Sequence, residues 1–233
     1  RNCAWKNDFT LYTTDVETSK NSARCNGALG QVYYYKAAES HDSIQKKMLL
    51  QKSVQHLEKA IKLYPGYFDA RLMIGLSINK YNKDYYKIWK YYKPIVEFVP
   101  KYSDPYNNMV FFLKECKNDS MKEDILKKMY KYDSTRYDLN FNLGMIYLNG
   151  YKKYNEASKY FLKVLNTEKE DLAFMNLGAC YYYVKDFNKS LYYYEKYFAI
   201  HPNDKDVLKF LISLCLLTNS KDKLTHYQSL MSK

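Results

Sequence analysis

Glycine and proline are scarce in this sequence, whose 233 residues include seven glycines and five prolines. A chain built from many short strands needs tight turns that favour these two residues, so the composition argues against an all-β fold. No run of 18 apolar residues occurs, which excludes a membrane-spanning helix within this stretch of chain. No secretory signal pattern is present. Hydrophobic residues make up 47% of the sequence, which is enough for a substantial buried core.

Paired cysteines are also lacking. The cysteines are odd in number and include no CxxC pair, so neither a zinc site nor a dithiol redox motif is indicated. We interpret them as small packing residues, because Cys180 and Cys215 fall where a helix should face its neighbour. The full set is Cys3, Cys25, Cys116, Cys180 and Cys215.

Motifs of known catalytic sites are missing as well. The sequence has no HExxH zinc motif, no GxSxG nucleophile elbow and no Gly-Lys-Ser/Thr phosphate loop. Its histidines have no metal-ligand spacing, and we expect His56 to be an exposed helix residue. The sequence therefore predicts no catalytic residue, no metal site, no cofactor and no enzyme within this segment. The histidines are His41, His56, His201 and His226.

What the sequence does contain is an internal repeat. Residues 141–147 (FNLGMIY) recur 34 positions later as residues 175–181 (MNLGACY). A period of that length, in a sequence rich in helix formers, indicates stacked pairs of helices.

Each copy is predicted to be a helix, a tight turn and a second helix. In the copy at 171–202, Gly178 is the small residue where the two helices cross closely, and the turn falls at 184–186. Pro202 ends the second helix, because proline has no N–H to continue the hydrogen-bond ladder. The apolar residues of the second helix are spaced as on one helix face. They are Phe187, Leu191, Tyr194 and Phe198.

The same pattern, with more variation, covers most of the chain and predicts an all-α superhelix of about six helix pairs. The first copy has an insertion around 38–47, and Pro94 is expected to kink the second helix of the next copy. The copy at 138–166 has one extra residue near 149–151. We divide the chain into an N-terminal segment and helix at 1–21, copies at 22–65, 68–100, 104–134, 138–166 and 171–202, and a C-terminal capping pair at 204–233.

These features resemble the tetratricopeptide repeat over about residues 22–231. The resemblance rests on the Leu-Gly pair and the Tyr of the first helix, the Ala or Ser that opens the second helix, and the Pro that follows it. It implies a right-handed superhelix with a concave groove lined by the first helix of each copy. Arrays of this family bind other molecules far more often than they catalyse, so we expect a protein-interaction module.

Carried over to this sequence, the resemblance gives the groove an apolar and aromatic surface with a few amides. We expect this surface to bind a peptide or an extended segment of a protein partner. Alternatively, the same side chains seal one copy against the next, and the array serves as a scaffold or self-associates. The predicted partner-binding residues are Tyr34, Leu72, Leu76, Asn79, Asn107, Phe111, Phe141, Met145, Asn149, Met175, Tyr182 and Tyr183.

The charge is strongly positive, with 37 Lys and Arg against 25 Asp and Glu, a net +12. This balance suggests attraction to acidic partners. The lysines are spread along the second helices, as at Lys90 and Lys159, a pattern typical of a solvated face. In the family, those helices form the outer wall, so nucleic-acid binding is not expected. It stays an alternative that a steep salt dependence of binding would reveal.

A second resemblance concerns residues 5–12 and 21–24. They are similar to the segment that follows the last membrane helix in transmembrane and tetratricopeptide-repeat mannosyltransferases, although Lys20 stands where that family usually has proline. The sequence starts at Arg1 without a methionine, and Arg1 and Trp5 suit a membrane interface. The resemblance implies a soluble domain tethered to a membrane through a missing N-terminal portion, on the extracytoplasmic (periplasmic) side. Any glycosyl transfer would reside in that portion. A free-standing cytoplasmic adaptor is the alternative.

Overall fold

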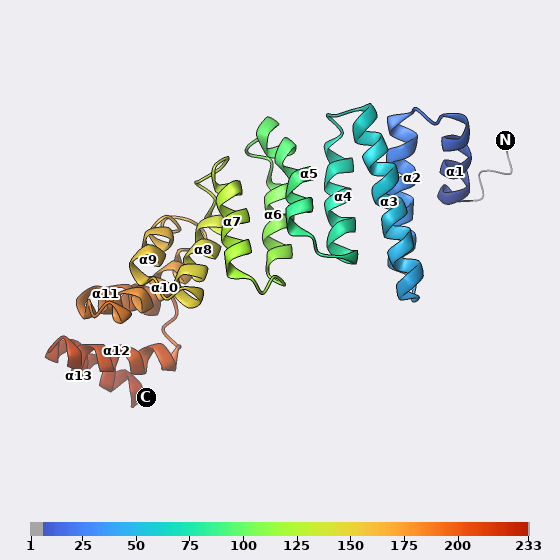
Figure 1. Ribbon diagram of the computed structural model, residues 1–233. Helices are drawn as coiled ribbons and strands as arrows, with labels where there is room; N and C mark the ends of the chain where they lie inside the picture. Colours follow the sequence, from blue (N-terminus) through green and yellow to red (C-terminus); the bar gives the residue numbers. More distant parts are fainter. Residues whose placement is uncertain (1–6, 233) are drawn as a thin grey trace. The chain divides into compact units, whose positions relative to one another are not determined.

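The regular structure of the computed structural model is helical throughout the described residues, 7–232 (Figure 1). This result confirms the predicted all-α class. The roles predicted for Arg1, Cys3 and Trp5 concern positions outside the described residues. The chain divides into two compact units, which we call unit 1 (Arg1–Tyr132) and unit 2 (Asp133–Lys233).

Unit 1 is built from consecutive helices that pack on one another in sequence order. The first helices of its pairs also contact the first helices of the neighbouring pairs, because α4 touches both α2 and α6. The helices are α1 (Asp8–Thr18), α2 (Ala23–Glu39), α3 (Ser43–Leu63), α4 (Phe68–Tyr81), α5 (Tyr85–Phe98), α6 (Ser103–Leu113) and α7 (Asp119–Tyr130). The helix pairs of unit 1 are α2–α3, α4–α5 and α6–α7, so the first helices of these pairs are α2, α4 and α6.

Unit 2 continues the same alternation. The extra residue predicted near 149–151 is accommodated by a π-helical turn, in which the Tyr151 N–H donates to the Ile146 carbonyl five residues earlier at 3.0 Å. The elements are α8 (Tyr137–Met145), the π-helical turn η2 (Ile146–Gly150), α9 (Tyr154–Leu162), α10 (Glu170–Tyr183), α11 (Phe187–Ile200), α12 (Lys205–Leu217) and α13 (Lys221–Met231).

Short polar side chains mark where many of these helices begin. Asp84 and Asp186 each accept a hydrogen bond from a backbone N–H in the first turn of α5 and α11, which satisfies a donor that has no partner inside the helix. The turn before α11 contains Lys185 with a φ of 64°, a left-handed conformation that reverses the chain. The predicted turn at 184–186 therefore coincides with the observed one.

Glycines allow the two helices of a pair to approach closely. A Cβ atom at Gly178 would lie 2.6 Å from the ring of Tyr194, which confirms the predicted close crossing. At Gly75 the same Cβ would overlap the phenol of Tyr92. Each of these glycines therefore leaves room for a large side chain on the opposing helix.

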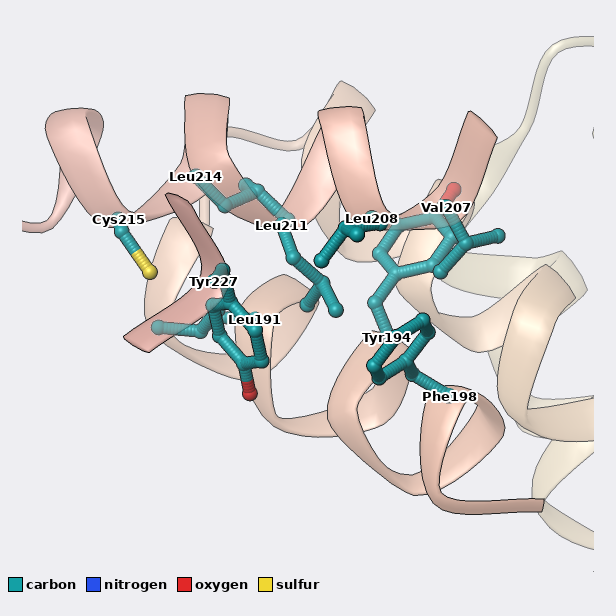
Figure 2. Close-up of a cluster of buried hydrophobic side chains, with 9 residues drawn as sticks. All are labelled: Leu191, Tyr194, Phe198, Val207, Leu208, Leu211, Leu214, Cys215 and Tyr227. Atoms are coloured by element: carbon teal, nitrogen blue, oxygen red, sulfur yellow. The ribbon is translucent and has the colours of Figure 1, made fainter. Parts of the chain in front are cut away.

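The core of the C-terminal part of unit 2 lies between α11 and α12 and is closed by Tyr227 of α13 (Figure 2). Three residues of the apolar stripe predicted for α11 belong to it, and Phe187 packs against its edge. Burial of each such side chain contributes about 1.5–3 kcal/mol. The cluster consists of Leu191, Tyr194, Phe198, Val207, Leu208, Leu211, Leu214, Cys215 and Tyr227.

Cys180 and His56 are both at least partly buried. Cys180 is a buried free thiol, and burial raises its pKa to about 12, as suits a packing residue. His56, by contrast, is not an exposed residue, and that prediction is wrong. Its ring stacks on Tyr33 with centroids 5.6 Å apart, and its Nδ1 lies 3.3 Å from the side-chain oxygen of Asn26. Burial, together with the charges of Lys59 and Lys52, lowers the pKa of His56.

The insertion at 38–47 lengthens the helices of the first pair. It falls at the end of α2, at the short connection and at the start of α3, which has 21 residues against 14 in α5. Pro94 lies inside α5, which runs continuously from Tyr85 to Phe98.

Candidate functional site

Unit 1 carries a cleft of about 520 Å3 along its first helices. We call it the unit 1 cleft. Residues from α2, α4 and α6 line it, with one contribution from α3, so three successive helix pairs build a single hollow. The lining consists of Gly27, Gln31, Leu57, Tyr67, Asp69, Ala70, Leu72, Met73, Leu76, Asp104 and Asn108.

The lining combines apolar and polar residues in about equal measure. Leu57 and Leu72 are buried, whereas Met73 and Leu76 are half-buried and leave part of their surface in the hollow. Gln31, Asp69 and Asp104 are exposed. The polar groups can fix the orientation of a ligand, and the apolar side chains can cover part of its surface.

Tyr92 fixes the helices that carry the cleft. Its side chain is fully buried beneath Gly75, and its hydroxyl donates to the backbone carbonyl of Leu72 at 3.2 Å. Burial raises the pKa of Tyr92, while a side-chain hydrogen bond with Asn108 opposes this effect. One phenol thus connects α5 to lining residues on both α4 and α6.

The two carboxylates of the cleft act on a common neighbour. The hydroxyl of Tyr102 donates to Asp104 Oδ2 at 2.8 Å, which holds that carboxylate in place. This hydrogen bond, followed by partial burial and the charges of Asp104 and Asp69, raises the pKa of Tyr102 to about 12. The negative charges of Asp69 and Asp104 therefore both act on the Tyr102 hydroxyl.

Asp69 and Asp104 belong to a series of aspartates with a shared position. Each is the second residue of the first helix in its pair, and the series continues in unit 2 with spacings of 33 to 35 residues. A carboxylate in the first turn of a helix is stabilised by the helix dipole. The series consists of Asp69, Asp104, Asp138, Asp171 and Asp206.

The aspartates of this series differ in their partners. In unit 2, Arg136 makes a two-pronged contact with Asp138 at 3.0 and 2.7 Å, His201 Nε2 lies 3.1 Å from Asp171, and Lys209 pairs with Asp206 at 3.0 Å. In unit 1, neither Asp69 nor Asp104 has a basic side chain within ion-pair distance among residues 7–232.

The predicted partner-binding residues of unit 1 are only partly brought together. Leu72 and Leu76 line the cleft, although Leu72 is 8% exposed and offers little surface. Tyr34 lies outside the lining, with the amine of Lys80 4.2 Å from its ring centroid. The other three, Asn79, Asn107 and Phe111, are also absent from the lining, and Phe111 is 61% exposed.

In unit 2, three of the predicted groove residues pack against neighbouring helices. Tyr182 lies 5.0 Å from Phe210, centroid to centroid, and packs against the edge of the core between α11 and α12. Phe141 and Met145 pack against a second core cluster, around Phe161. All three side chains are half-buried, so helix packing covers part of each and leaves the rest exposed. Their assignment to a groove stays a prediction. Tyr183, Met175 and Asn149 are exposed, and Tyr183 stacks on Tyr154 with centroids 4.6 Å apart.

A second hollow of about 540 Å3 lies between α1 and α2. The amine of Lys36 stands 3.3 Å from the ring centroid of Phe9 at its edge, a cation–π contact that ties the two helices together. This hollow is formed by one pair of helices rather than by successive repeats.

Two kinds of feature are absent from residues 7–232. No group of three or more histidine, cysteine, aspartate or glutamate side chains there could hold a metal ion. No helix of that part is both long enough and apolar enough to cross a membrane.

No family model matches this sequence. Tetratricopeptide repeat protein 6 of Homo sapiens is 26% identical over 151 residues, which are 64% of this chain and 28% of the human protein. The match thus spans less than a third of that relative's length.

Solved structures give a clearer likeness. YrrB, described as "a TPR protein with an unusual peptide-binding site", has a TM-score of 0.54 at 18% identity, over 85% of this chain and 96% of YrrB. PilF of Pseudomonas aeruginosa has a TM-score of 0.50 at 18% identity, over 85% and 88%. The Naa15/Naa10 complex bound to HypK-THB has a TM-score of 0.56 at 13% identity, over 88% of this chain and 30% of the other. This chain has the tetratricopeptide-repeat fold. At these identities the likeness concerns the fold alone.

The unit 1 cleft lies on the first helices of three consecutive helix pairs of this fold. The sequence analysis assigned a groove to the first helices and named Leu72 and Leu76 of this lining, but not its polar residues Gln31, Asp69, Asp104 and Asn108. The two aspartates could have been found, since they stand 35 residues apart, close to the repeat period of 34. The helix dipole already explains a carboxylate at the start of a helix, so the sequence offered no separate reason to assign these aspartates to a binding site.

Proposed function

We propose that this chain is a protein-interaction module that binds an extended peptide segment in the unit 1 cleft. The observation that carries the proposal is the cleft itself, because the first helices of three successive repeats line one continuous hollow. A partner segment that runs across α2, α4 and α6 would contact all three repeats at once.

The chemistry of the lining supports a peptide as the ligand. Met73 and Leu76 can cover an apolar side chain, whose full burial contributes about 1.5–3 kcal/mol. Gln31 and Asn108 carry amides, which can both donate to and accept from a peptide backbone. The solved structure of YrrB, which has the same fold, is described as having a peptide-binding site.

A selection from a random dodecapeptide library displayed on phage tests the proposal. Peptides enriched on the purified chain are synthesised, and their affinities are measured by isothermal titration. In the variant Leu76→Trp, the larger ring fills the hollow, so affinity should fall by about 10-fold or more. The matched control is Leu63→Trp, at a 40% exposed position on α3 that does not line the cleft, and it should bind like the wild type.

Two outcomes would contradict this function. Either no peptide is enriched above the unselected library, or the enriched peptides bind Leu76→Trp as tightly as the wild type. Circular dichroism and thermal unfolding of both variants establish that each retains the helical fold during the comparison.

The membrane tether belongs to this proposal only as a prediction from the N-terminal resemblance. In that arrangement the array displays its cleft from the membrane surface and receives a partner segment there. Several apolar segments of about 20 residues encoded upstream of Arg1 would support the tether. A free-standing adaptor would have the same cleft without such segments.

A further inference from the structure

The charge of the unit 1 cleft is opposite to the charge of the chain. The chain has a formal net charge of +12, yet the charged members of the lining are Asp69 and Asp104, and no lysine or arginine is among them. A negatively charged cleft in a positively charged protein is suited to a positively charged ligand.

The helix dipole explains why an aspartate stands at each of these positions, but not why two of them have no counter-ion. At the same position in unit 2, Asp138, Asp171 and Asp206 all have a basic neighbour within 3.1 Å. The two aspartates that face the cleft are those with no ion-pair partner among the described residues.

The surroundings of the two carboxylates are organised. Tyr102 donates to Asp104 Oδ2 at 2.8 Å and so limits the rotation of that side chain. Asp69 stands on the neighbouring first helix, and its charge also reaches Tyr102. Beside them, Met73 and Leu76 offer an apolar surface.

We infer that the unit 1 cleft selects a partner segment that carries a lysine or arginine, whose cationic head lies at Asp69 and Asp104 and whose aliphatic stem covers Met73 and Leu76. Long basic side chains bury their stems on apolar surface and keep their heads at charged or solvated groups, so one residue satisfies both parts of the lining. This inference rests on the proposed function, since it names the chemistry of the same ligand.

Sequence enrichment is the first test. The dodecapeptides selected on the wild-type chain should contain lysine or arginine more often than the unselected library does. For one enriched peptide, replacing the basic residue with glutamine should weaken binding by about 10-fold, because the charge-assisted hydrogen bonds are lost. Selected peptides without enrichment in basic residues would overturn the inference.

Carboxylate variants supply the second test. Asp69→Asn and Asp104→Asn should each weaken binding of that peptide by about 3- to 10-fold, and the double variant by more than either. Raising the salt concentration should weaken binding to the wild type and have little effect on the double variant. The matched control is Asp119→Asn, which removes the same charge from the first turn of α7 outside the cleft, and its affinity should be unchanged.

A charge reversal distinguishes a direct contact from a general field. Asp69→Lys should bind the peptide whose basic residue is replaced with glutamate more tightly than the wild type does. Equal affinity of the wild type and both asparagine variants for the basic peptide would overturn the inference. In that case, loss of binding in Leu76→Trp would still uphold the proposed function, whereas unchanged binding there would remove it.

A second copy of this chain is the competing occupant, because its own lysines could reach the cleft. Analytical ultracentrifugation of the wild type and the double asparagine variant decides this point. A monomeric wild type supports a separate partner. A wild-type dimer that dissociates in the double variant would assign the cleft to self-association and overturn the inference.

Discussion

Asp104 in unit 1 and Asp138 in unit 2 occupy the same position of successive first helices, but their surroundings differ. Arg136 neutralises Asp138 through two hydrogen bonds, and both side chains are largely buried. Asp104 receives the Tyr102 hydroxyl and faces a cleft. The same register of the same fold thus supports a closed ion pair in one unit and an open acidic site in the other.

The aromatic side chains show the same contrast. In unit 2, Tyr182 packs on Phe210 and Phe141 packs on Phe161, so these half-buried rings of the first helices contact neighbouring helices. In unit 1, Tyr92 is placed beneath the first helices, and the cleft above it remains open. Such packing contacts contribute to stability, and the open cleft remains available to a partner.

The largest expected effect concerns the glycines that both units share. Gly178→Leu in unit 2 and Gly75→Leu in unit 1 should each destabilise the chain by about 1–3 kcal/mol, because the added side chain overlaps Tyr194 or Tyr92. Urea unfolding followed by circular dichroism measures the change. Gly66 is exposed, so the control variant Gly66→Leu should change stability by less than about 0.5 kcal/mol. Similar effects at Gly66 and Gly178 would refute the close crossing.

An intermediate effect on stability is expected when a ring packed on neighbouring rings is compared with a largely exposed ring. Tyr182→Ala should destabilise the chain by about 1–2 kcal/mol, since it removes contacts with Phe187 and Phe210. Phe111→Ala, at a 61% exposed position, should change stability by less than about 0.5 kcal/mol. Neither change should alter affinity for a peptide bound in the unit 1 cleft. If Tyr182→Ala weakens peptide binding under conditions in which the variant remains folded, the binding surface includes unit 2, as the sequence alone predicts.

The smallest effect compares two buried tyrosines at equivalent places. The Tyr92 hydroxyl bonds to Leu72, whereas the Tyr194 hydroxyl has no hydrogen-bond partner within residues 7–232. Tyr92→Phe should therefore lose about 1 kcal/mol, and Tyr194→Phe about 0.5 kcal/mol or less. Chemical denaturation of both variants provides the values, and equal losses would contradict the comparison. Tyr92→Phe should also weaken peptide binding slightly, because Tyr92 holds two lining residues in place.

Much of the helical framework follows from the sequence, because glycine, apolar spacing and helix caps act locally. Gly178 and the stripe around Tyr194 are examples, since each is determined by the repeat in which it lies. The packing of Tyr182 is not determined locally, because its ring becomes partly covered only when the next helix pair places Phe210 against it. The partners of Asp69 and Asp138 are likewise set by neighbouring side chains, which the repeat period does not specify.

Methionine labelling tests the central claim most directly. Met73 lines the unit 1 cleft, whereas Met175 is an exposed residue of unit 2 that the sequence assigned to the groove. With carbon-13 in the methionine methyl groups, a selected basic peptide is titrated into the full chain, and the two signals are assigned by Met73→Leu and Met175→Leu. The account predicts a saturable shift of the Met73 signal while the Met175 signal stays in place. A shift of Met175 with Met73 unmoved would contradict it.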